Sequence, residues 1–164
     1  MKALVVYYSY SGITRRLAED IALITDGDLR ELKPQKPYSF SYNTAVKEAR
    51  EEIEKGYCPP LIQGAETIEN ADVVFIGSPN WLKTFAPPVL SFLRTVDLSG
   101  KTIIPFCTHE GSGMAGTARV FRRMFKHSTV NSGISVLGHV AQNDRHKADI
   151  AVTTWLKLTL RFIP

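Results

Sequence analysis

The sequence predicts a doubly wound α/β fold, in which a five-stranded parallel sheet is covered by helices on both faces to give three layers. Strand-like and helix-like segments alternate throughout the 164 residues, which is typical of parallel strands joined by right-handed helical crossovers. Several strand-like segments, such as Val73-Val74-Phe75-Ile76, are almost continuously apolar. Strands have this pattern when both faces of their sheet are buried.

Five segments are expected to be strands because each is a short, largely apolar run: 2–8, 28–32, 72–77, 102–108 and 133–140. Helices are expected between and after them, where the residue pattern has helical spacing: 14–25, 44–55, 87–96, 116–127 and about 145–162. The first helix shows this spacing clearly, since Leu17, Ala18, Ile21 and Ala22 fall on one face. The second carries charge at most positions and is expected to lie at the surface.

Length and composition fit one globular domain over residues 1–164, because 44% of the residues are hydrophobic and 22% are charged. No apolar stretch approaches the ~20 residues that a membrane helix needs. The first strand begins without the pattern of a signal peptide. We therefore expect a soluble, cytoplasmic protein that does not bind a membrane.

Metal and nucleic-acid sites are not expected. The two cysteines, Cys58 and Cys107, lack the spacing of metal ligands, and the four histidines are scattered along the chain. The net charge of +4 and the pI near 9.1 come from dispersed basic residues in expected helices, where a charged face is usually just solvated. No metal is assigned, and nucleic acid is not expected as a partner.

Two segments punctuated by proline flank the charged helix, residues 33–42 and 56–60, and both carry aromatic side chains. Long loops with aromatic residues in a compact fold either serve ligand binding or pack against the domain. The sequence leaves both roles open.

The turn after the first strand has the composition of a phosphate-binding loop. Ser9-Tyr10-Ser11-Gly12-Ile13-Thr14 joins a buried strand to the start of a helix. At such a junction backbone N–H groups point outward at the positive end of the helix dipole, and hydroxyl side chains add further donors. This loop, residues 9–14, is called the phosphate loop below.

The loops after the third and fourth expected strands complement the phosphate loop, because ligands of open parallel sheets bind beyond the carboxyl ends of the strands. Trp81 offers a flat apolar plate for an aromatic ring. Gly111 and Gly113 let backbone amides approach a ligand closely, and Thr108 and Ser112 can hydrogen-bond its polar edge. Together the three loops have the parts of a flavin mononucleotide (FMN) site.

In this order the loops resemble those of the flavodoxin-like family, and specifically the short flavodoxin-domain proteins related to flavodoxins and to flavin-dependent NAD(P)H:quinone oxidoreductases. The resemblance covers most of the chain and is strongest at 9–14, 77–93 and 106–113. Residues 37–57 are similar to an insertion found in one branch of the family. The resemblance implies the strand order 2-1-3-4-5 and FMN as the cofactor.

By this resemblance the FMN phosphate is held by Ser9, Ser11, Gly12, Ile13 and Thr14. The isoalloxazine ring is lined by Pro79, Asn80 and Trp81. The other edge of the ring is bordered by Thr108, Glu110, Gly111, Ser112 and Gly113. No residue is assigned a catalytic role, because the cofactor carries the chemistry.

Two positions depart from the family pattern. Leu82 stands where a second aromatic residue is common, which predicts weaker or one-sided stacking. Glu110 stands where small residues are common, and a carboxylate that faces the ring would disfavour the anionic reduced flavin by charge repulsion. We expect Glu110 to lower the flavin reduction potential if its side chain faces the ring, and to have no such effect if it points into solvent.

The resemblance implies an FMN-dependent oxidoreductase that passes electrons from NAD(P)H to a quinone or to a similar small-molecule or protein acceptor. Two alternatives stay open, a flavodoxin-type electron carrier between protein partners and an interaction module that binds no flavin. The basic net charge disfavours the simple carrier, because carriers of this family tend to be acidic. The final helix is more apolar than a one-sided surface helix requires, which predicts a homodimer.

Overall fold

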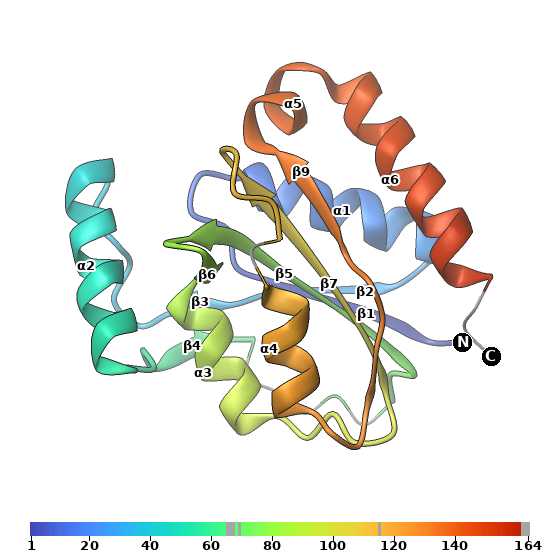
Figure 1. Ribbon diagram of the computed structural model, residues 1–164, viewed down its shortest axis with the longest axis horizontal. Coiled ribbons are helices and arrows are strands. Elements are labelled where there is room, and N and C mark those ends of the chain that lie inside the picture. The colour runs from blue at the N-terminus through green and yellow to red at the C-terminus, as the bar shows by residue number, and fades with distance from the viewer. Residues whose placement is uncertain (65–67, 69, 115, 162–164) are drawn as a thin grey trace.

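A parallel sheet forms the centre of the computed structural model, which describes residues 1–64, 68, 70–114 and 116–161 (Figure 1). Its strands β1 (Ala3–Tyr7), β2 (Asp28–Glu31), β5 (Val73–Trp81) and β7 (Thr102–His109) lie in the order β2-β1-β5-β7. Beyond β7, the strands β8 (Thr129–Val130) and β9 (Ile134–Leu137) both pair with it in parallel. With β9 as the fifth expected strand, this arrangement confirms the order 2-1-3-4-5.

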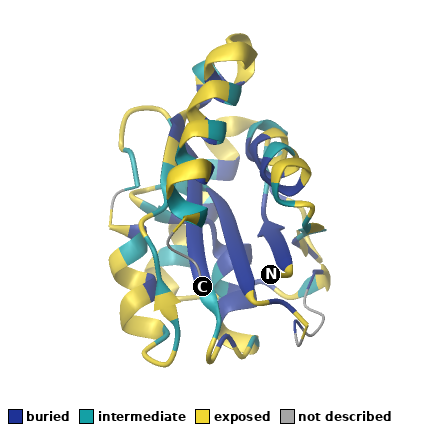
Figure 2. Cartoon of the chain, turned by 90° about the vertical axis from the view of Figure 1, so that its right-hand side faces the viewer, coloured by how far each residue is buried: buried dark blue, intermediate teal, exposed yellow. Residues whose placement is uncertain are grey.

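Helices cover both faces of the sheet (Figure 1). One face carries α1 (Ile13–Thr25), α5 (Gly138–Asn143) and α6 (Arg145–Leu160), and the other carries α2 (Tyr42–Lys55), α3 (Pro87–Thr95) and α4 (Thr117–Met124). Strand residues alternate between the two layers, since Val5 packs with α1 whereas Val6 packs with α3. Figure 2 shows the buried strands between the exposed outer surfaces of the helices. The three-layer prediction is confirmed.

The first crossover shows why the sequence folds in this way. The apolar stripe predicted for the first helix, Leu17, Ala18, Ile21 and Ala22, is buried in α1. The helix begins after Gly12, whose φ of 89° lies in the left-handed region that glycine adopts most readily. The turn between β1 and α1 is therefore tight, and it places the phosphate loop directly at the carboxyl end of β1.

Several short elements lie outside the predicted pattern. A two-stranded antiparallel sheet is formed by β3 (Lys33–Pro34) and β4 (Leu61–Gln63), and β6 (Thr84–Phe85) pairs with the end of β5 as a hairpin. The strand expected at 72–77 therefore continues to Trp81. The turn of this hairpin places Leu82 and Lys83 at φ values of 52° and 67°, which a sequence without Gly or Asn at these positions does not signal.

The carboxyl-terminal elements differ from expectation at their ends. The strand expected at 133–140 ends at Leu137, and α5 begins at Gly138. Short apolar runs fit either a strand or a helix, and the helix here buries Ala141 against α1 and the sheet. The last helix ends at Leu160, and residue 162 lies outside the described residues.

Half of the apolar residues in α6 cover the sheet. Val152 and Leu156 are fully buried, and Trp155 packs edge-on against Phe75 at 6.1 Å between ring centroids. Ile150 and Leu158 are 53% and 55% exposed. These two apolar side chains are open to a contact with a second copy, and the homodimer stays a prediction. None of the helices in the described part of the chain has the length and apolar character of a membrane span.

The buried thiol of Cys107 is expected to be unreactive in the folded protein. Burial in β7 raises its pKa to about 12, and the thiolate is the reactive form. Cys58 is only half-buried. In a thiol titration with Ellman's reagent at about pH 8, one thiol per chain should react before urea is added and the second only after unfolding. Cys58→Ser should remove the fast reaction, and rapid reaction of both thiols would contradict the assignment.

Candidate functional site

A cavity of about 250 Å³ lies beyond the carboxyl ends of β1, β5 and β7, and it is called the carboxyl-end cavity below. The strand order reverses between β1 and β5, which is where doubly wound sheets bind their ligands. The phosphate loop, the β5–β6 hairpin, the loop after β7 and the starts of α2 and α5 contribute to its walls. The lining residues are Tyr10, Ser11, Ile13, Thr14, Tyr42, Pro79, Asn80, Trp81, Thr108, His109, Glu110, Ser112 and Gly138.

The phosphate loop presents hydrogen-bond donors. The Ser9 hydroxyl oxygen accepts from the backbone amides of Gly12 at 3.1 Å and Arg15 at 3.2 Å. Because a hydroxyl has two acceptor lone pairs and one proton, both lone pairs are used and the proton is left to donate. The amides of Ser11, Ile13 and Thr14 have no protein acceptor among the residues that the structure describes. These donors lie at the start of α1, where the helix dipole favours an anion.

A buried pair of hydroxyls joins the phosphate loop to the end of β7. Thr14 and Thr108 are 2% and 6% exposed, and their hydroxyl oxygens lie 2.8 Å apart. One of the two donates to the other, so one hydroxyl proton remains for a ligand in the cavity. The pair fixes the relative position of two loops that are 94 residues apart in the sequence.

The basic residues of the first turn of α1 contribute little to this donor set. The Arg15 guanidinium forms an ion pair with Glu31 on β2, and this contact raises the pKa of Arg15 further. Its charge is therefore already compensated, while Arg16 is exposed to solvent. Backbone amides and hydroxyls, rather than arginine side chains, make the loop suitable for a phosphate.

Trp81 is held in place by three tyrosines. Its ring contacts those of Tyr8, Tyr10 and Tyr38 edge-on, with centroid distances of 5.8, 5.6 and 5.0 Å. Such edge-to-face contacts favour one ring orientation. Leu82 follows at the tip of the hairpin, is 40% exposed and does not line the cavity. The cavity therefore has one aromatic wall at this position.

Asn80 offers a buried hydrogen-bond acceptor to the cavity. Its side-chain amide donates to the Gly113 carbonyl oxygen at 2.6 Å, which fixes the amide orientation and joins the two loops. Its Oδ1 atom is buried and has no hydrogen-bond partner in the described part of the chain. An unpaired buried acceptor costs about 1–3 kcal/mol. An N–H group on a ligand in the cavity would satisfy it.

Two titratable residues at the end of β7 and in the loop after it line the cavity. Glu110 is exposed to solvent, and its carboxylate lies close to Gly138, where a Cβ atom would lie 2.1 Å from the Glu110 Oε1 atom. The His109 Nδ1 atom accepts from the Gly111 amide at 2.9 Å, which places the ring proton of neutral His109 on Nε2. The Glu110 carboxylate and the His109 ring therefore both lie at the rim of the cavity.

Most of the predicted site residues gather in this cavity. Those that line it are Ser11, Ile13, Thr14, Pro79, Asn80, Trp81, Thr108, Glu110 and Ser112. Those that do not are Ser9, Gly12, Gly111 and Gly113. The lining residues that were not predicted are Tyr10, Tyr42, His109 and Gly138. Tyr42 belongs to the aromatic segment 33–42, which was the available signal for it.

The segment before α2 packs against the phosphate loop. The Tyr10 hydroxyl donates to the Ser39 carbonyl oxygen at 2.7 Å, and the Ser39 amide donates to Glu48 of α2 at 3.0 Å. Tyr38 is buried and its hydroxyl donates to Glu52. Of the two roles that the sequence left open, packing is therefore realised by Tyr38 and Ser39, while Tyr42 lines the cavity.

Glu52→Gln is expected to stabilise the protein increasingly as the pH rises. Burial raises the pKa of Glu52, and the hydrogen bond from Tyr38 offsets this only in part. The folded state then binds the proton more tightly than the unfolded state, so the contribution of Glu52 to stability is present at low pH and is lost as the pH rises through the folded-state pKa. Glutamine keeps an acceptor for Tyr38 without a charge. Urea unfolding from about pH 4 to about pH 8 should show that the free energy of unfolding of Glu52→Gln exceeds that of the wild type by an amount that grows with pH. A difference that does not change with pH would contradict the assignment.

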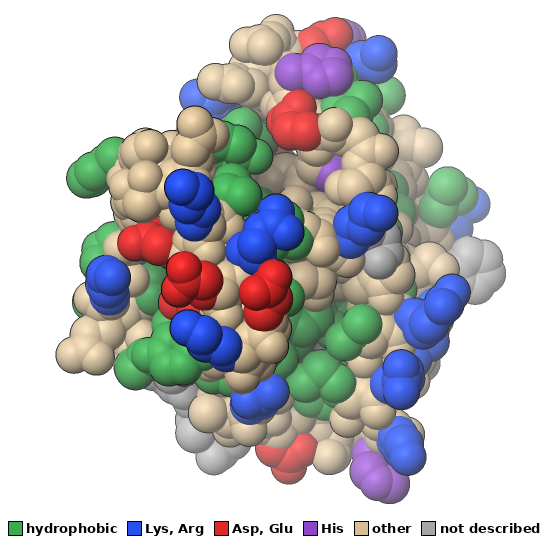
Figure 3. Space-filling model, turned by 60° about the vertical axis from the view of Figure 1, so that its left-hand side comes forward, with side chains coloured by type: hydrophobic (Ala, Val, Ile, Leu, Met, Phe, Trp, Pro, Cys, Tyr) green, Lys and Arg blue, Asp and Glu red, His purple; other side chains and the backbone are tan. Residues whose placement is uncertain are grey.

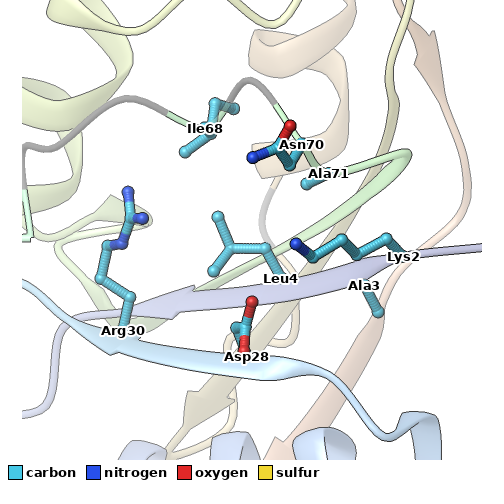
Figure 4. Close-up of a pocket in the computed structure, with 8 residues that line it drawn as sticks. All are labelled: Lys2, Ala3, Leu4, Asp28, Arg30, Ile68, Asn70 and Ala71. Carbon is cyan, nitrogen blue, oxygen red and sulfur yellow. The ribbon is translucent and has the colours of Figure 1, made fainter.

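A second hollow, of about 160 Å³, lies at the opposite end of the sheet (Figure 4). Its labelled side chains come from β1 and the residue before it, from β2 and from the segment before β5, and Lys2, Asp28, Arg30 and Asn70 make it polar. This hollow is at the amino ends of parallel strands, away from the carboxyl-end cavity, and it is not part of the candidate site.

Comparison with known proteins identifies the family. A flavodoxin profile matches residues 2–153. A protein of Bacteroides eggerthii that is designated a flavoprotein is 28% identical, with a TM-score of 0.78 and 96% of each chain covered. Another from Bacteroides uniformis is 25% identical, with a TM-score of 0.79 over 95% of this chain and 97% of that one. A flavoprotein of Lactobacillus acidophilus, solved in complex with FMN, shares the fold at 22% identity, with a TM-score of 0.68 over 87% of this chain and 97% of that one.

No curated protein matches significantly. The chain belongs to the flavodoxin family.

Proposed function

We propose that the protein binds FMN in the carboxyl-end cavity and passes electrons from NAD(P)H to a quinone or a similar acceptor. Membership of the flavodoxin family and the FMN complex of the Lactobacillus acidophilus protein support the cofactor. The observation that carries the proposal is the donor set of the phosphate loop beside a cavity in which the Asn80 Oδ1 atom lacks a partner. A dianionic phosphate and a ring with an N–H group match these two features.

Each part of the cofactor has a set of residues in this proposal. The phosphate is held by Ser9, Ser11, Gly12, Ile13 and Thr14. The ring lies against Pro79, Asn80 and Trp81, with Thr108, Glu110, Gly111, Ser112 and Gly113 along its other edge. Bound FMN would supply the hydride and electron chemistry. The chain binds and orients it, and the Asn80 Oδ1 atom accepts from a ring N–H.

An absorbance spectrum of the purified protein with and without added FMN tests the proposal. Flavin bands that remain after gel filtration would support binding, and anaerobic bleaching by NADH or NADPH alone would support the oxidoreductase. Bound FMN that requires a separate protein reductant would support the electron carrier instead. A colourless protein that takes up no FMN would overturn both proposals and favour an interaction module.

Glu110→Gln is expected to raise the reduction potential of bound FMN by about 30 mV, the shift that corresponds to a tenfold change for a two-electron couple. The carboxylate lines the cavity, where it would repel negative charge on the reduced flavin. Spectroelectrochemical titration of both proteins at low salt measures the shift, and about 0.5 M salt should reduce it by screening. An unchanged potential at low salt would show that Glu110 does not act on the ring.

The electron carrier is the second candidate, and although its family members tend to be acidic, a basic surface along α4 indicates the kind of partner that this chain would need. The surface consists of Arg119, Arg122 and Arg123 of α4 together with Lys126, all of them exposed. None forms an ion pair within the described residues. Figure 3 shows Lys and Arg side chains gathered down one side of this part of the molecule. Such a surface favours the approach of an acidic partner.

Oxidation of the reduced protein by two small reagents of opposite charge tests this surface. Anionic ferricyanide should react faster at low salt than at high salt, whereas cationic hexaammineruthenium should show the opposite dependence. Arg119→Glu/Arg122→Glu should remove the advantage of ferricyanide. The control, Lys47→Glu/Arg50→Glu, makes the same charge change on the exposed face of α2. Equal effects of both pairs would show that only the net charge matters.

A further inference from the structure

The basic surface along α4 is elongated. Its three arginines, Arg119, Arg122 and Arg123, are spaced by three and four residues, so they lie on one face of the helix. Lys126 follows in the turn after the helix, and all four residues are exposed. From the first arginine to the third the helix rises by about 6 Å. The four cations therefore form a row and not a compact cluster.

One end of this row lies towards the carboxyl-end cavity and the other lies away from it. Ser112 of the loop after β7 lines the cavity, and α4 begins shortly after that loop. Beyond α4 the chain returns to β8, which pairs with the amino end of β7. The helix therefore runs from the carboxyl edge of the sheet towards its amino edge (Figure 1). Arg119 is at the near end of the row, and Lys126 is at the far end.

The charge of the basic surface is not compensated. Residues 111–143 contain no aspartate or glutamate, and none of the four cations forms an ion pair within the described residues. Arg15 differs in this respect, because its guanidinium pairs with Glu31. Arginine binds phosphate groups through planar, bidentate contacts. A ligand with phosphate groups spaced along its length would match the row.

Two apolar side chains lie beside the arginines. Val120 and Met124 are 36% and 38% exposed, and each directly follows an arginine in α4. Because they are four residues apart, they lie on the same side of the helix. The flat base of a nucleotide can pack on such side chains and stack on a guanidinium group. An inorganic anion would use only the cations, whereas a nucleotide would use both kinds of side chain.

We propose that the basic surface binds the phosphates and the adenosine of the nicotinamide donor, and that it selects NADPH over NADH. The inference rests on the proposed function, because it takes the nicotinamide to react at the carboxyl-end cavity. The pyrophosphate, which both donors carry, then meets Arg119 at the near end. The 2′-phosphate, which NADPH alone carries, meets Arg123 and Lys126 at the far end. The row of cations that leads away from the cavity favours this ligand over the acidic protein that an electron carrier would bind here.

Calorimetric titration at low salt tests the surface without FMN. Adenosine 2′,5′-bisphosphate, which carries the 2′-phosphate of NADPH, should bind about tenfold more tightly than 5′-AMP, as expected for added hydrogen bonds between charged groups. Arg123→Gln/Lys126→Gln should remove this difference. The control, Lys47→Gln/Arg50→Gln, removes the same charge from the exposed face of α2 and should retain it. Inorganic pyrophosphate that binds as tightly as the bisphosphate would show a general anion surface and overturn the inference.

Stopped-flow reduction of the FMN-loaded protein tests the link to the cavity. The half-saturating concentration of NADPH should be about tenfold lower than that of NADH, with similar limiting rate constants, because the added contact acts on binding and not on the reacting ring. Arg123→Gln/Lys126→Gln should raise the half-saturating concentration of NADPH to that of NADH. Arg119→Gln should raise both by the same factor, since both donors carry the pyrophosphate.

The outcomes separate this inference from the proposed function. Reduction by both donors with equal half-saturating concentrations would leave the function in place and overturn the inference. Bisphosphate binding through Arg123 and Lys126 in a protein that takes up no FMN would support the nucleotide site and overturn only its role in electron donation. Rapid reduction by an acidic reductase, slow reduction by both nucleotides and loss of the reductase reaction in Arg123→Gln/Lys126→Gln would assign the surface to a protein partner and overturn the inference.

Discussion

Ser11→Asp is expected to weaken FMN binding about 100-fold or more. Ser11 is exposed, belongs to the phosphate loop and lines the carboxyl-end cavity, so an aspartate there would face the phosphate. Two unit charges about 4 Å apart interact by about 4 kcal/mol at the effective dielectric constant of a protein surface, and about 2.8 kcal/mol already corresponds to 100-fold in affinity. Quenching of flavin fluorescence on titration measures the change.

Two comparisons isolate the charge effect in Ser11→Asp. Ser11→Asn has nearly the same shape without the charge and should retain most of the affinity. Riboflavin, which lacks the phosphate, should bind both variants and the wild type equally. Folding should not suffer, because a negative charge next to the start of α1 is favourable for the helix dipole. Equal losses for FMN and riboflavin would show that the phosphate lies elsewhere.

Gly77→Ala is expected to lower the free energy of unfolding by about 3 kcal/mol, at the upper end of the usual cost of overpacking. A Cβ atom at Gly77 would lie 2.1 Å from the Cζ atom and 2.3 Å from the Cε2 atom of the Phe106 ring. Phe106 is 1% exposed on the neighbouring strand β7, so its ring has no room to withdraw. Urea unfolding monitored by circular dichroism measures the loss.

A double-mutant cycle assigns this loss to the ring. Phe106→Leu alone should lower the free energy of unfolding by about 1 kcal/mol or more, because it leaves unfilled space. In the Gly77→Ala background the same change should restore much of the stability that Gly77→Ala removes. The coupling free energy between the two positions should therefore be about 2 kcal/mol. Gly100→Ala is the control, since a Cβ atom there meets nothing within 4 Å and only its φ of 73° opposes the change. Additive effects in the cycle would contradict the steric explanation.

The central layers were predictable because burial determines their composition. β1 and the central parts of β5 and β7 are covered on both faces, so their residues are mainly apolar, and the apolar stripe of α1 matches one helical face. The β5–β6 hairpin was not predictable, because Leu82 and Lys83 adopt left-handed conformations that their side chains disfavour. Pairing of β3 with β4 depends on residues almost 30 positions apart, which local patterns do not encode.

For the candidate site, the sequence indicated the loops but not which atoms face the cavity. Ser11 and Asn80 lie where the order of the loops along the sheet predicts. The orientation of Ser9 depends on the amides of Gly12 and Arg15, which turn its side chain into the loop. Tyr10 could not be assigned, because its role depends on Ser39, 29 residues further along the chain. Contacts across such separations are decided by tertiary packing.

The hydroxyl of Tyr10 determines how the segment before α2 can be moved between proteins. It donates to the carbonyl oxygens of Ser39 and Phe40, at 2.7 and 3.3 Å, from within the phosphate loop. A chimera that grafts residues 33–60 onto another doubly wound scaffold must therefore transfer the tyrosine as well as the segment. Without Tyr10, the carbonyl oxygens of Ser39 and Phe40 lose their hydrogen-bond donor. The grafted segment would then keep its helix but would not be held in a fixed position against the host sheet.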